Sequence, residues 1–265
     1  MIFRKGIAQI MESNMLKGMS RHMSFPRLRT VGINGVLIQF SKILTESSNR
    51  AAIAFANIVR QELEEVVDEV SATLTSTFVC FDPLKFTHDS IITSLDLLLQ
   101  QQDWYHKDLP KQRRHFTIPC VFGSSLGPQF TEAAEAAGLN NEEAIRELTS
   151  TSNRVLSIGF APGQPYIGQL GSNWDFPRLK SLNPKVPKGA LIAAIRQLII
   201  FSSENPTGWY HIGQTGFECF RPNKPEPFAL RPGDEISLTS VSQRELEKIL
   251  RLDSSGNGGA EIKSI

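Results

Sequence analysis

The sequence predicts a small α+β domain followed by a mainly-β barrel, and three observations lead to this fold class. Residues 24–105 carry two strand-like stretches, each followed by an amphipathic helical pattern. From Val155 onward, short β-like runs alternate with Gly/Pro turns and show little helical period. A basic stretch at residues 106–115 separates the part with helical patterns from the part with short β-like runs, and is interpreted as a linker. We therefore expect the α+β domain at residues 24–112 and the barrel domain at residues 113–252.

The first domain is expected to alternate strands and helices. Residues 35–40 (GVLIQF) and 73–81 (TLTSTFVCF) are rich in β-branched and aromatic side chains, which favour strands. Residues 49–67 and 88–101 instead space their apolar side chains three and four apart, which predicts two helices. The apolar faces are formed by Ala52, Phe55, Ala56, Val59 and Leu63 in the first helix, and by Ile91, Ile92, Leu95, Leu98 and Leu99 in the second.

The second domain begins with a strand at residues 115–122 (HFTIPCVF), followed by two short helices. The first helix carries Phe130, Ala133, Ala134 and Ala137 on one face and is expected to end at Gly138. Asn140 and Glu143 have the spacing of a capping box, so a second helix is expected to run through Leu148. The later elements are strands at 155–160, 190–195, 197–201 and 235–240, and a final helix from Ser242 to Leu252.

Both ends of the chain are expected to lie outside the folded domains. All five methionines fall within the first 23 residues, so residues 1–23 are interpreted as a disordered leader or as a stretch upstream of a true start at Met23. The tail at residues 253–265 (DSSGNGGAEIKSI) is expected to be disordered because of its glycine and serine content.

Composition excludes several classes of function. A net charge of +1, from 28 basic and 27 acidic residues, gives no overall field for nucleic acid or anionic membrane. No run approaches the roughly 18 apolar residues of a membrane span. Cys80, Cys120 and Cys219 stand singly on apolar stretches, which predicts free thiols in a reducing, cytoplasmic compartment. No His/Cys cluster has the spacing of a metal site.

One catalytic motif is present. GSSLG, residues 123–127, has the form of a nucleophile elbow with Ser125 as nucleophile, and Asp175 and His211 follow in the order of a triad. An α/β-hydrolase would place several parallel strands before the elbow, and Pro128 separates the serine from the following helix. A Ser125 hydrolase is therefore kept only as a second alternative.

A more extensive constellation begins in GFAPGQPYIGQL, residues 159–170. Its glycines permit close backbone approach, and its prolines stiffen the loop before a ligand binds. Further Gly/Pro turns follow, and each brings a polar or aromatic side chain. On spacing alone, barrel corners with core aromatics and surface arginines explain this pattern more simply than a binding site. The candidate substrate-binding residues are Phe160, Pro162, Gly163, Tyr166, Arg178 and Trp209, and the candidate catalytic residues are Arg196 and Gln197.

The blocks GFAPGQPYIG, PRL, VPKG, NPTGW, IGQT and LRPGDEI resemble the KipI/PxpB family in order and spacing. This family includes the B subunits of 5-oxoprolinase, the proteins named allophanate hydrolase subunit 1, and subdomains C and D of the carboxyltransferase region of urea carboxylase. The upstream blocks FTIPCVFGSSLGPQF and STFVCFDPL are similar to family blocks too. The resemblance spans roughly residues 31–240, and it implies that the barrel is cyclophilin-like.

The resemblance also implies an activity shared with partners. Family members pair with a KipA/PxpC-type subunit, and a third subunit of the LamB/YcsF type, similar to PxpA, is compatible with this. Such complexes open 5-oxoproline with ATP, and the related part of urea carboxylase transfers a carboxyl group from carboxybiotin. The leading expectation is therefore a cytoplasmic enzyme subunit acting on a small amide or cyclic amide. Arg196 would neutralise a carboxylate or developing negative charge, and Gln197 would orient the carbonyl.

The chain departs from the family pattern at several positions. AIRQLIIFS, residues 194–202, has Ile195 and Ile199 where relatives carry glycines, so we expect the backbone there to avoid positive φ. Gln129 replaces an aspartate and Gln214 replaces an arginine, which would remove charge from the site. These departures keep open an alternative, a KipI-like module that binds and regulates a histidine kinase without catalysis.

Overall fold

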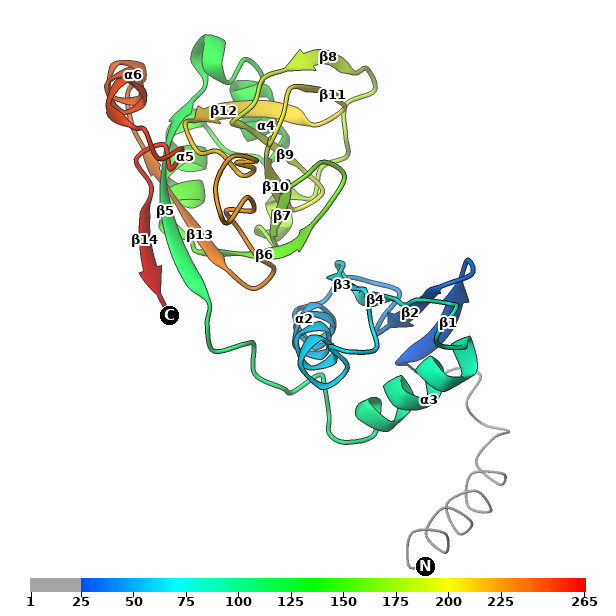
Figure 1. Ribbon diagram of the computed structural model, residues 1–265. Coiled ribbons are helices and arrows are strands. Elements are labelled where there is room, and N and C mark those ends of the chain that lie inside the picture. Colours follow the sequence, from blue (N-terminus) through cyan, green and yellow to red (C-terminus); the bar gives the residue numbers. More distant parts are fainter. Residues whose placement is uncertain (1–24) are drawn as a thin grey trace, which may run out of the picture.

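The computed structural model describes residues 25–265, so the predicted leader at residues 1–23 lies outside the described residues. The described chain forms two units, each with its own hydrophobic core (Figure 1). The first unit ends after α3, and a connecting segment leads from it into β5, the first strand of the second unit. The division of the chain at residue 112 into two domains stays a prediction.

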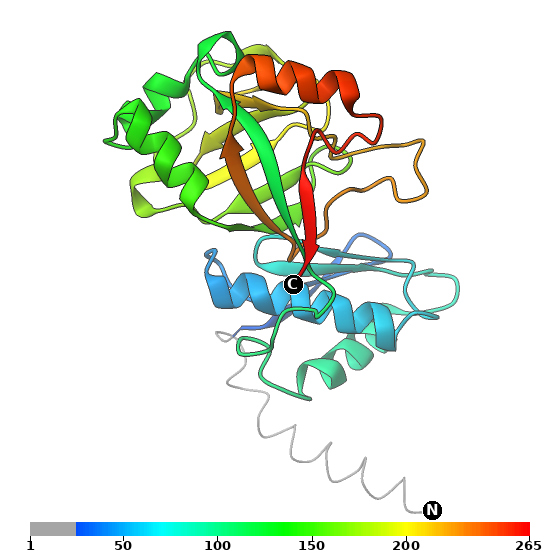
Figure 2. The ribbon, with the colours of Figure 1, turned by 90° about the vertical axis from the view of Figure 1, so that its left-hand side faces the viewer.

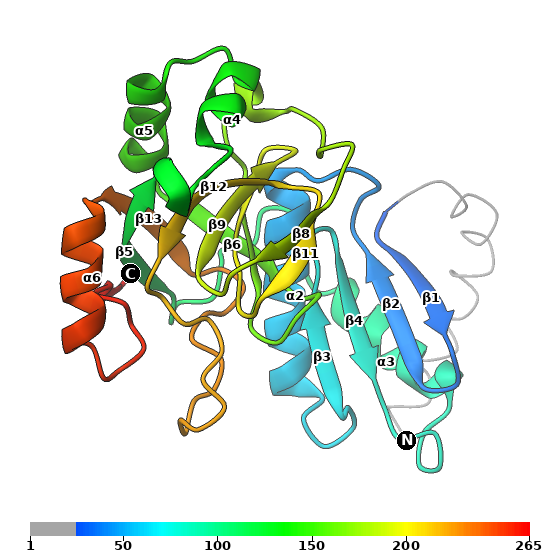
Figure 3. The same cartoon turned by 90° about the horizontal axis from the view of Figure 1, so that it is seen from above.

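The first unit is a four-stranded antiparallel sheet in the order β1-β2-β4-β3, with two helices packed on one face (Figures 1 and 3). Apolar side chains of the sheet and both helices form its core, in which the rings of Phe55 and Trp104 meet edge to face at 4.9 Å. The elements are β1 (Arg27–Val31), β2 (Gly35–Gln39), α2 (Glu46–Glu62), β3 (Glu69–Ala72), β4 (Ser76–Cys80) and α3 (His88–Leu99).

Capping boxes determine where both helices of this unit begin. The Thr45 hydroxyl accepts from the Ser48 amide at the start of α2, and Thr87 and Ser90 repeat the arrangement at α3. Helix α2 therefore starts three residues before the first residue predicted. It ends at Glu62 with Leu63 as the C-cap, before the predicted end at residue 67, and the amide of Val67 donates to Leu63 O at 3.0 Å in the turn that follows.

The second unit contains a closed barrel of seven strands, which confirms the predicted mainly-β barrel. Their order is β12-β9-β10-β7-β6-β13-β5, and pairing of β12 with β5 closes the cylinder. All pairs are antiparallel except β13 with β5. The strands are β5 (Arg114–Phe122), β6 (Asn153–Ile158), β7 (Pro165–Gly168), β9 (Ala190–Ala194), β10 (Gln197–Ile200), β12 (Tyr210–Thr215) and β13 (Glu235–Ser240).

Short helices and a small ribbon lie outside the barrel (Figure 3). The capping box predicted at Asn140 and Glu143 is confirmed at the start of α5. Helix α4 was expected to end at Gly138; its C-cap is Ala137, and Gly138 follows with a positive φ. Ser242 caps α6 through Glu245. These elements are η1 (Ser124–Leu126), α4 (Phe130–Ala136), α5 (Asn141–Ser150), η2 (Ser172–Trp174), the paired strands β8 (Asn183–Val186) and β11 (Asn205–Thr207), and α6 (Gln243–Leu252).

The tail predicted to be disordered, residues 253–265, is ordered instead. Strand β14 (Glu261–Ser264) pairs antiparallel with the outer edge of β5 (Figure 2). Before it, the Asp253 carboxylate accepts hydrogen bonds from the amides of Ser255 and Gly258 at 2.8 and 2.6 Å. Gly258 has φ +58 and lies against the Gly216 backbone, so the glycine taken as a sign of disorder provides a tight turn.

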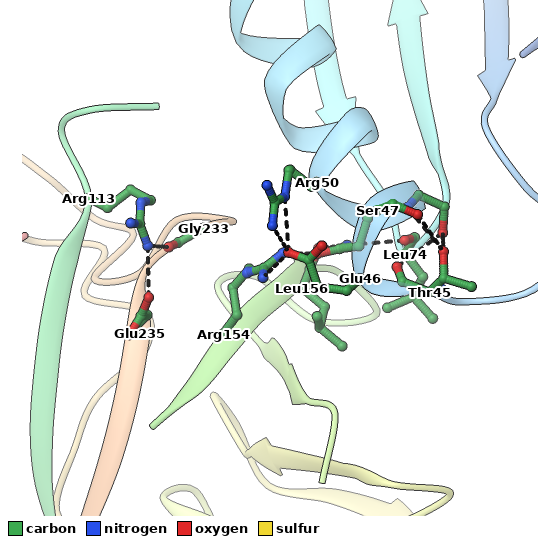
Figure 4. Close-up of polar contacts among 12 residues, drawn as sticks. Thr45, Glu46, Ser47, Arg50, Leu74, Arg113, Arg154, Leu156, Gly233 and Glu235 are labelled. Atoms are coloured by element: carbon green, nitrogen blue, oxygen red, sulfur yellow. Dashed lines mark hydrogen bonds and ion pairs between the residues drawn. The ribbon is translucent and has the colours of Figure 1, made fainter. Parts of the chain in front are cut away.

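Polar contacts join the two units at the start of α2 (Figure 4). The fully buried Asn49 side chain donates to Leu74 O in its own unit at 3.0 Å and to Leu156 O of β6 at 2.9 Å. Beside it, Arg154 of β6 forms an ion pair with Glu46 at 2.8 Å. Because the carbonyl of Leu156 would lose its Asn49 donor if the units separated, this contact favours a fixed arrangement.

Candidate functional site

The candidate site lies where the segment of residues 169–179, here called the strap, crosses the turn between β9 and β10. A strap that contacts a barrel hairpin through its backbone is held more firmly than a free surface loop. Three backbone hydrogen bonds join the two: Ile195 N–H to Phe176 O at 2.9 Å, Arg196 N–H to Trp174 O at 3.0 Å, and Leu170 N–H to Arg196 O at 2.8 Å.

Three of the predicted substrate-binding residues come together beside this strap. The guanidinium carbon of Arg178 lies 5.4 Å from the centre of the Trp209 ring, within cation–π range. The ring of Tyr166 meets the same indole edge to face at 6.4 Å. Trp209 is only 5% exposed, whereas Arg178 is exposed and Tyr166 is half-buried. The result is an aromatic wall of Tyr166 and Trp209, with the exposed Arg178 cation over the Trp209 ring.

The predicted catalytic residues Arg196 and Gln197 occupy the adjacent β9–β10 turn. Arg196 is half-buried, and its Nε donates to Leu170 O at 3.0 Å, which also ties it to the strap. Gln197 is 5% exposed and pairs with Gly168 of β7, where a Cβ would lie 2.9 Å from Arg196 O. Among residues 25–265, neither Arg178 nor Arg196 forms an ion pair with an acidic side chain. Both cations are therefore available to an anionic ligand.

The backbone of this turn corrects one sequence prediction. Ile195 was expected to avoid positive φ, but it has φ +46, and Arg196 follows with φ +60. Two consecutive positive φ values in a two-residue connection match a type I′ hairpin turn, the geometry that suits twisted strands. The three hydrogen bonds from the strap hold this conformation despite the β-branched side chain. At Ile199 the backbone is extended within β10.

The remaining predicted substrate-binding residues lie in a separate turn at 159–164. Phe160 and Pro162 are exposed there, while Gly163 is buried. A Cβ at Gly163 would lie 2.7 Å from Cys219 O, so this turn packs on the chain at Cys219 and Phe220. In the described part of the chain, no hydrogen bond, ion pair or ring contact joins these three residues to Tyr166, Arg178 or Trp209.

Two residues that the sequence did not indicate, Glu147 and Asn183, hold the strap and the chain at Trp209. Glu147 of α5 accepts from the Trp174 indole at 2.9 Å and from Asn173 at 3.1 Å. Asn183 of β8 donates to Trp209 O at 3.1 Å and to the Gln129 side chain at 2.8 Å. Each contact joins residues 26 or more positions apart, so no local spacing could have indicated them.

The two glutamines interpreted as lost site charges have structural contacts. The Gln129 carbonyl accepts from the His211 amide at 2.8 Å as well as from Asn183. Gln214 donates to Lys188 O at 2.9 Å and to Thr215 O at 3.0 Å, and so supports the turn before β9. Both side chains therefore contribute to the fold around the barrel.

The structure does not assemble a triad around Ser125. Ser125 is exposed in η1, and Asp175 is exposed in the strap. His211 is buried, and its Nε2 donates to Gly213 O at 3.1 Å. No hydrogen bond links any two of these three residues among those described, so the arrangement offers no base for the serine.

His211 instead provides a pH-dependent contribution to stability. Burial lowers its pKa below the usual value, although its contacts with the backbone at Gly213 and Leu126 oppose the shift. The unfolded chain binds a proton near pH 6.5. The contribution of His211 to the free energy of unfolding is therefore fully present above about pH 6.5. It is lost as the pH falls toward the lower pKa of His211 in the folded protein.

We expect the free energy of unfolding to fall between pH 7.5 and pH 5.5, by at most about 1.4 kcal/mol per pH unit from this residue. Urea unfolding of the wild type and of His211→Gln at both pH values measures this contribution. The variant should lose less stability on acidification than the wild type. An identical pH dependence in the two proteins would contradict the assignment.

The structure shows no metal centre or membrane helix in the residues it describes. No group of three or more His, Cys, Asp or Glu side chains within residues 25–265 could hold a metal ion. In the same range, no helix has the length and apolar character needed to cross a membrane. Cys120 and Cys219 are buried free thiols, and burial raises the pKa of Cys219 to about 12, so neither is a reactive thiolate.

Known proteins resemble the chain over most of its length. The family described as "Carboxyltransferase domain, subdomain C and D" matches residues 26–230. The B subunit of 5-oxoprolinase from Bacillus subtilis (strain 168) is 27% identical over 229 residues, which cover 83% of this chain and 94% of that protein. The protein of the same name from Escherichia coli O157:H7 is 27% identical over 225 residues, covering 84% and 99%.

A solved structure shares the fold. The urea amidolyase of Kluyveromyces lactis superposes with a TM-score of 0.69 at 15% identity. The match covers 89% of this chain but 16% of that chain, so this chain is similar to a small part of a much longer protein.

Proposed function

Because the chain belongs to the family of carboxyltransferase domains, subdomains C and D, we propose that it is one subunit of an ATP-dependent complex that processes a small amide. The names of its relatives support this role, since the B subunit of 5-oxoprolinase is by its name one part of a multi-component enzyme. The finer proposal is a cyclic amide such as 5-oxoproline as substrate, with ring opening to the amino acid.

The arrangement of Arg178, Trp209 and Tyr166 carries this proposal. A small cyclic amide with a carboxylate presents a flat ring and one negative charge. The half-buried Tyr166 ring of the aromatic wall fits the flat ring, and Arg178, which lies over the Trp209 ring, fits the carboxylate because a guanidinium binds carboxylate oxygens in a bidentate manner. The adjacent Arg196 supplies a second cation without an acidic partner among the described residues.

We assign the reactive roles to the β9–β10 turn. Arg196 would stabilise negative charge that develops on the amide oxygen, and Gln197 would orient the carbonyl. Phe160, Pro162 and Gly163 are not assigned to the substrate, because their turn packs on Cys219 and Phe220.

The complex would be completed by other subunits. We propose a KipA/PxpC-type partner and a third subunit of the LamB/YcsF type, working together in the cytoplasm. ATP would supply the free energy for opening the ring. Carboxybiotin, as a carboxyl donor, is the alternative.

Reconstitution with the partner subunits tests the function. We expect glutamate to form from 5-oxoproline only when ATP is present, and Arg178→Ala to raise KM about tenfold through loss of the carboxylate contact. Lys180→Ala removes an exposed cation two residues after Arg178 and should keep the wild-type KM. Ring opening without ATP, product formation only with carboxybiotin, or an unchanged KM for Arg178→Ala would contradict the respective part of the proposal.

One observation favours a second function, binding of a regulatory protein. Phe160 is 76% exposed at a positive φ, and Phe228 is 48% exposed with its ring 5.3 Å from that of Phe220. Exposed aromatic side chains of this kind are common at protein interfaces. In a histidine kinase autophosphorylation assay, a KipI-like module would inhibit the kinase, and Phe160→Ala would weaken that inhibition without changing the fold.

A further inference from the structure

A second cavity, distinct from the candidate site, lies at the junction of the two units. Its volume is about 730 Å³, which falls within the range of small-molecule sites. Four segments form its walls: the second half of α2, Ala72 at the end of β3, the connecting segment at 107–113, and the turn at 231–234 before β13. Figure 1 shows the connecting segment passing beside α2 before it enters β5. Because the walls come from both units, the cavity depends on the junction contacts drawn in Figure 4.

The lining of this cavity is strongly basic. Five basic side chains line it against two acidic ones, Asp108 and Asp234. Asp234 is 2% exposed and is already neutralised by Arg114, whose Nη2 lies 2.6 Å from its carboxylate. The positive charge of the cavity is therefore in excess.

Three of the five basic side chains are held by contacts, and two remain available. The Nη2 of Arg60 donates to Val70 O at 2.6 Å. Arg113 pairs with Glu235 at 2.8 Å, and Arg231 pairs with Glu226 at 3.3 Å. Lys107 and Lys111, by contrast, form no ion pair with any residue in the described range 25–265. They stand four residues apart in the connecting segment, with Asp108, Leu109 and Pro110 between them, so the two lysines outnumber the one acidic side chain beside them. Two unpaired ammonium groups at the rim of a cavity attract a phosphate or carboxylate.

The rest of the wall is apolar with two amides. Ile53 and Ile58 of α2 face the cavity together with Leu109, Pro110 and Pro232. Asn57 and Gln61, one helical turn apart on α2, add amide donors and acceptors. A ligand that satisfies all three features has anionic groups, a flat apolar body and polar atoms on the edge of that body.

We propose that this cavity binds a nucleoside phosphate, with the phosphates at Lys107 and Lys111 and the base against the apolar wall. The cavity is argued from its own lining, and this inference rests on the proposed function only because ATP is chosen as the first ligand to test. Binding is measured on this chain alone, so its failure is separate from a failure of amide turnover in the reconstituted complex.

Isothermal titration at fixed ionic strength compares ATP, tripolyphosphate and adenosine as probes. We expect ATP to bind more tightly than either of the others, because only ATP contacts both the lysines and the apolar wall. Tripolyphosphate that binds as tightly as ATP would overturn a nucleotide site in favour of a phosphate-only site. Absence of ATP binding would overturn the proposal entirely.

Matched variants test the lysines. Lys107→Gln combined with Lys111→Gln is expected to raise the Kd for ATP at least about tenfold, because two charge-assisted contacts are lost. Lys42→Gln combined with Lys224→Gln changes the net charge equally at two exposed positions that do not line the cavity, and should leave the Kd within about twofold. Equal losses in both double variants would show a non-specific charge effect and overturn the assignment.

A second measurement needs no variant. Acetylation of the wild-type chain followed by mass spectrometry reports the reactivity of each lysine. ATP should protect Lys107 and Lys111 and leave Lys42 and Lys224 unprotected. Equal labelling of Lys107 and Lys111 with and without ATP would contradict the proposed site.

Discussion

Replacing Arg196 by glycine is expected to lower kcat/KM of the reconstituted complex at least about 100-fold, since a group that stabilises developing charge typically contributes this much. The proposed role of Arg196 is to neutralise charge on the amide oxygen, and no acidic side chain in the described chain pairs with it. Its loss should therefore affect kcat more than KM, because the contact is made chiefly in the transition state.

Glycine is the appropriate replacement because it preserves the fold. Arg196 has φ +60, a conformation that costs a non-glycine residue about 1–2 kcal/mol. Glycine removes that cost, while the lost bond from Arg196 Nε to Leu170 O is worth about 0.5–1.5 kcal/mol. The two changes nearly cancel, so the free energy of unfolding should stay within about 1 kcal/mol of the wild type.

Ile195→Gly provides the matched control. It relaxes the neighbouring residue of the same turn, at φ +46, and removes no functional group assigned to the site. We expect this variant to keep wild-type turnover and to be more stable by about 1 kcal/mol. Wild-type kcat/KM in Arg196→Gly would refute the catalytic role, and an equal loss in Ile195→Gly would assign the effect to turn geometry.

The sequence could predict those features of the fold that depend on neighbouring residues. The capping box at Asn140 and Glu143 defined the start of α5, and the two apolar runs at 190–195 and 197–201 contain β9 and β10. These signals are local, because a cap needs residues three apart and a strand needs a short apolar stretch. The barrel followed from the same kind of evidence.

The features that were missed depend on contacts between distant residues. The left-handed turn at Ile195 and Arg196 is imposed by the strap, through acceptors at Phe176 and Trp174. In isolation, a β-branched residue argues against that conformation, and the local argument was overridden by tertiary hydrogen bonds. Strand β14 was missed for a similar reason, since its partner β5 lies more than 140 positions earlier.

The same distinction explains which of the predicted site residues lie together in the structure. Tyr166, Arg178 and Trp209 were selected as side chains beside Gly/Pro turns, and the structure brings them together. Phe160 and Pro162 were selected by the same criterion but lie in a turn that packs elsewhere. A Gly/Pro turn therefore indicates a barrel corner reliably, and only the packing of that corner decides whether it faces the site.

Replacing Gly163 by alanine is expected to lower the free energy of unfolding by about 3 kcal/mol, from two causes that add. Gly163 has φ +71, which costs alanine about 1–2 kcal/mol. The new Cβ would also lie 2.7 Å from Cys219 O and 3.1 Å from Phe220 Cβ, and overpacking of this kind costs about 1–3 kcal/mol. Cys219 O accepts from the Ala229 amide at 3.0 Å, so it cannot move without weakening that bond. Urea unfolding at neutral pH measures the change.

Gly159 provides a control within the same turn. Its φ is not positive and nothing lies within 4 Å of a Cβ built there, so Gly159→Ala should change stability by less than about 1 kcal/mol. Comparing Gly163→Ala with Gly159→Ala also distinguishes a substrate-binding role of Gly163 from a structural one. A residue that contacts substrate would lose activity on substitution while the protein stays as stable as the wild type. A residue that shapes the turn would lose stability first, and the contact with Cys219 requires this second outcome. If Gly163→Ala is as stable as Gly159→Ala but inactive in the reconstituted complex, the turn at 159–164 belongs to the substrate site after all.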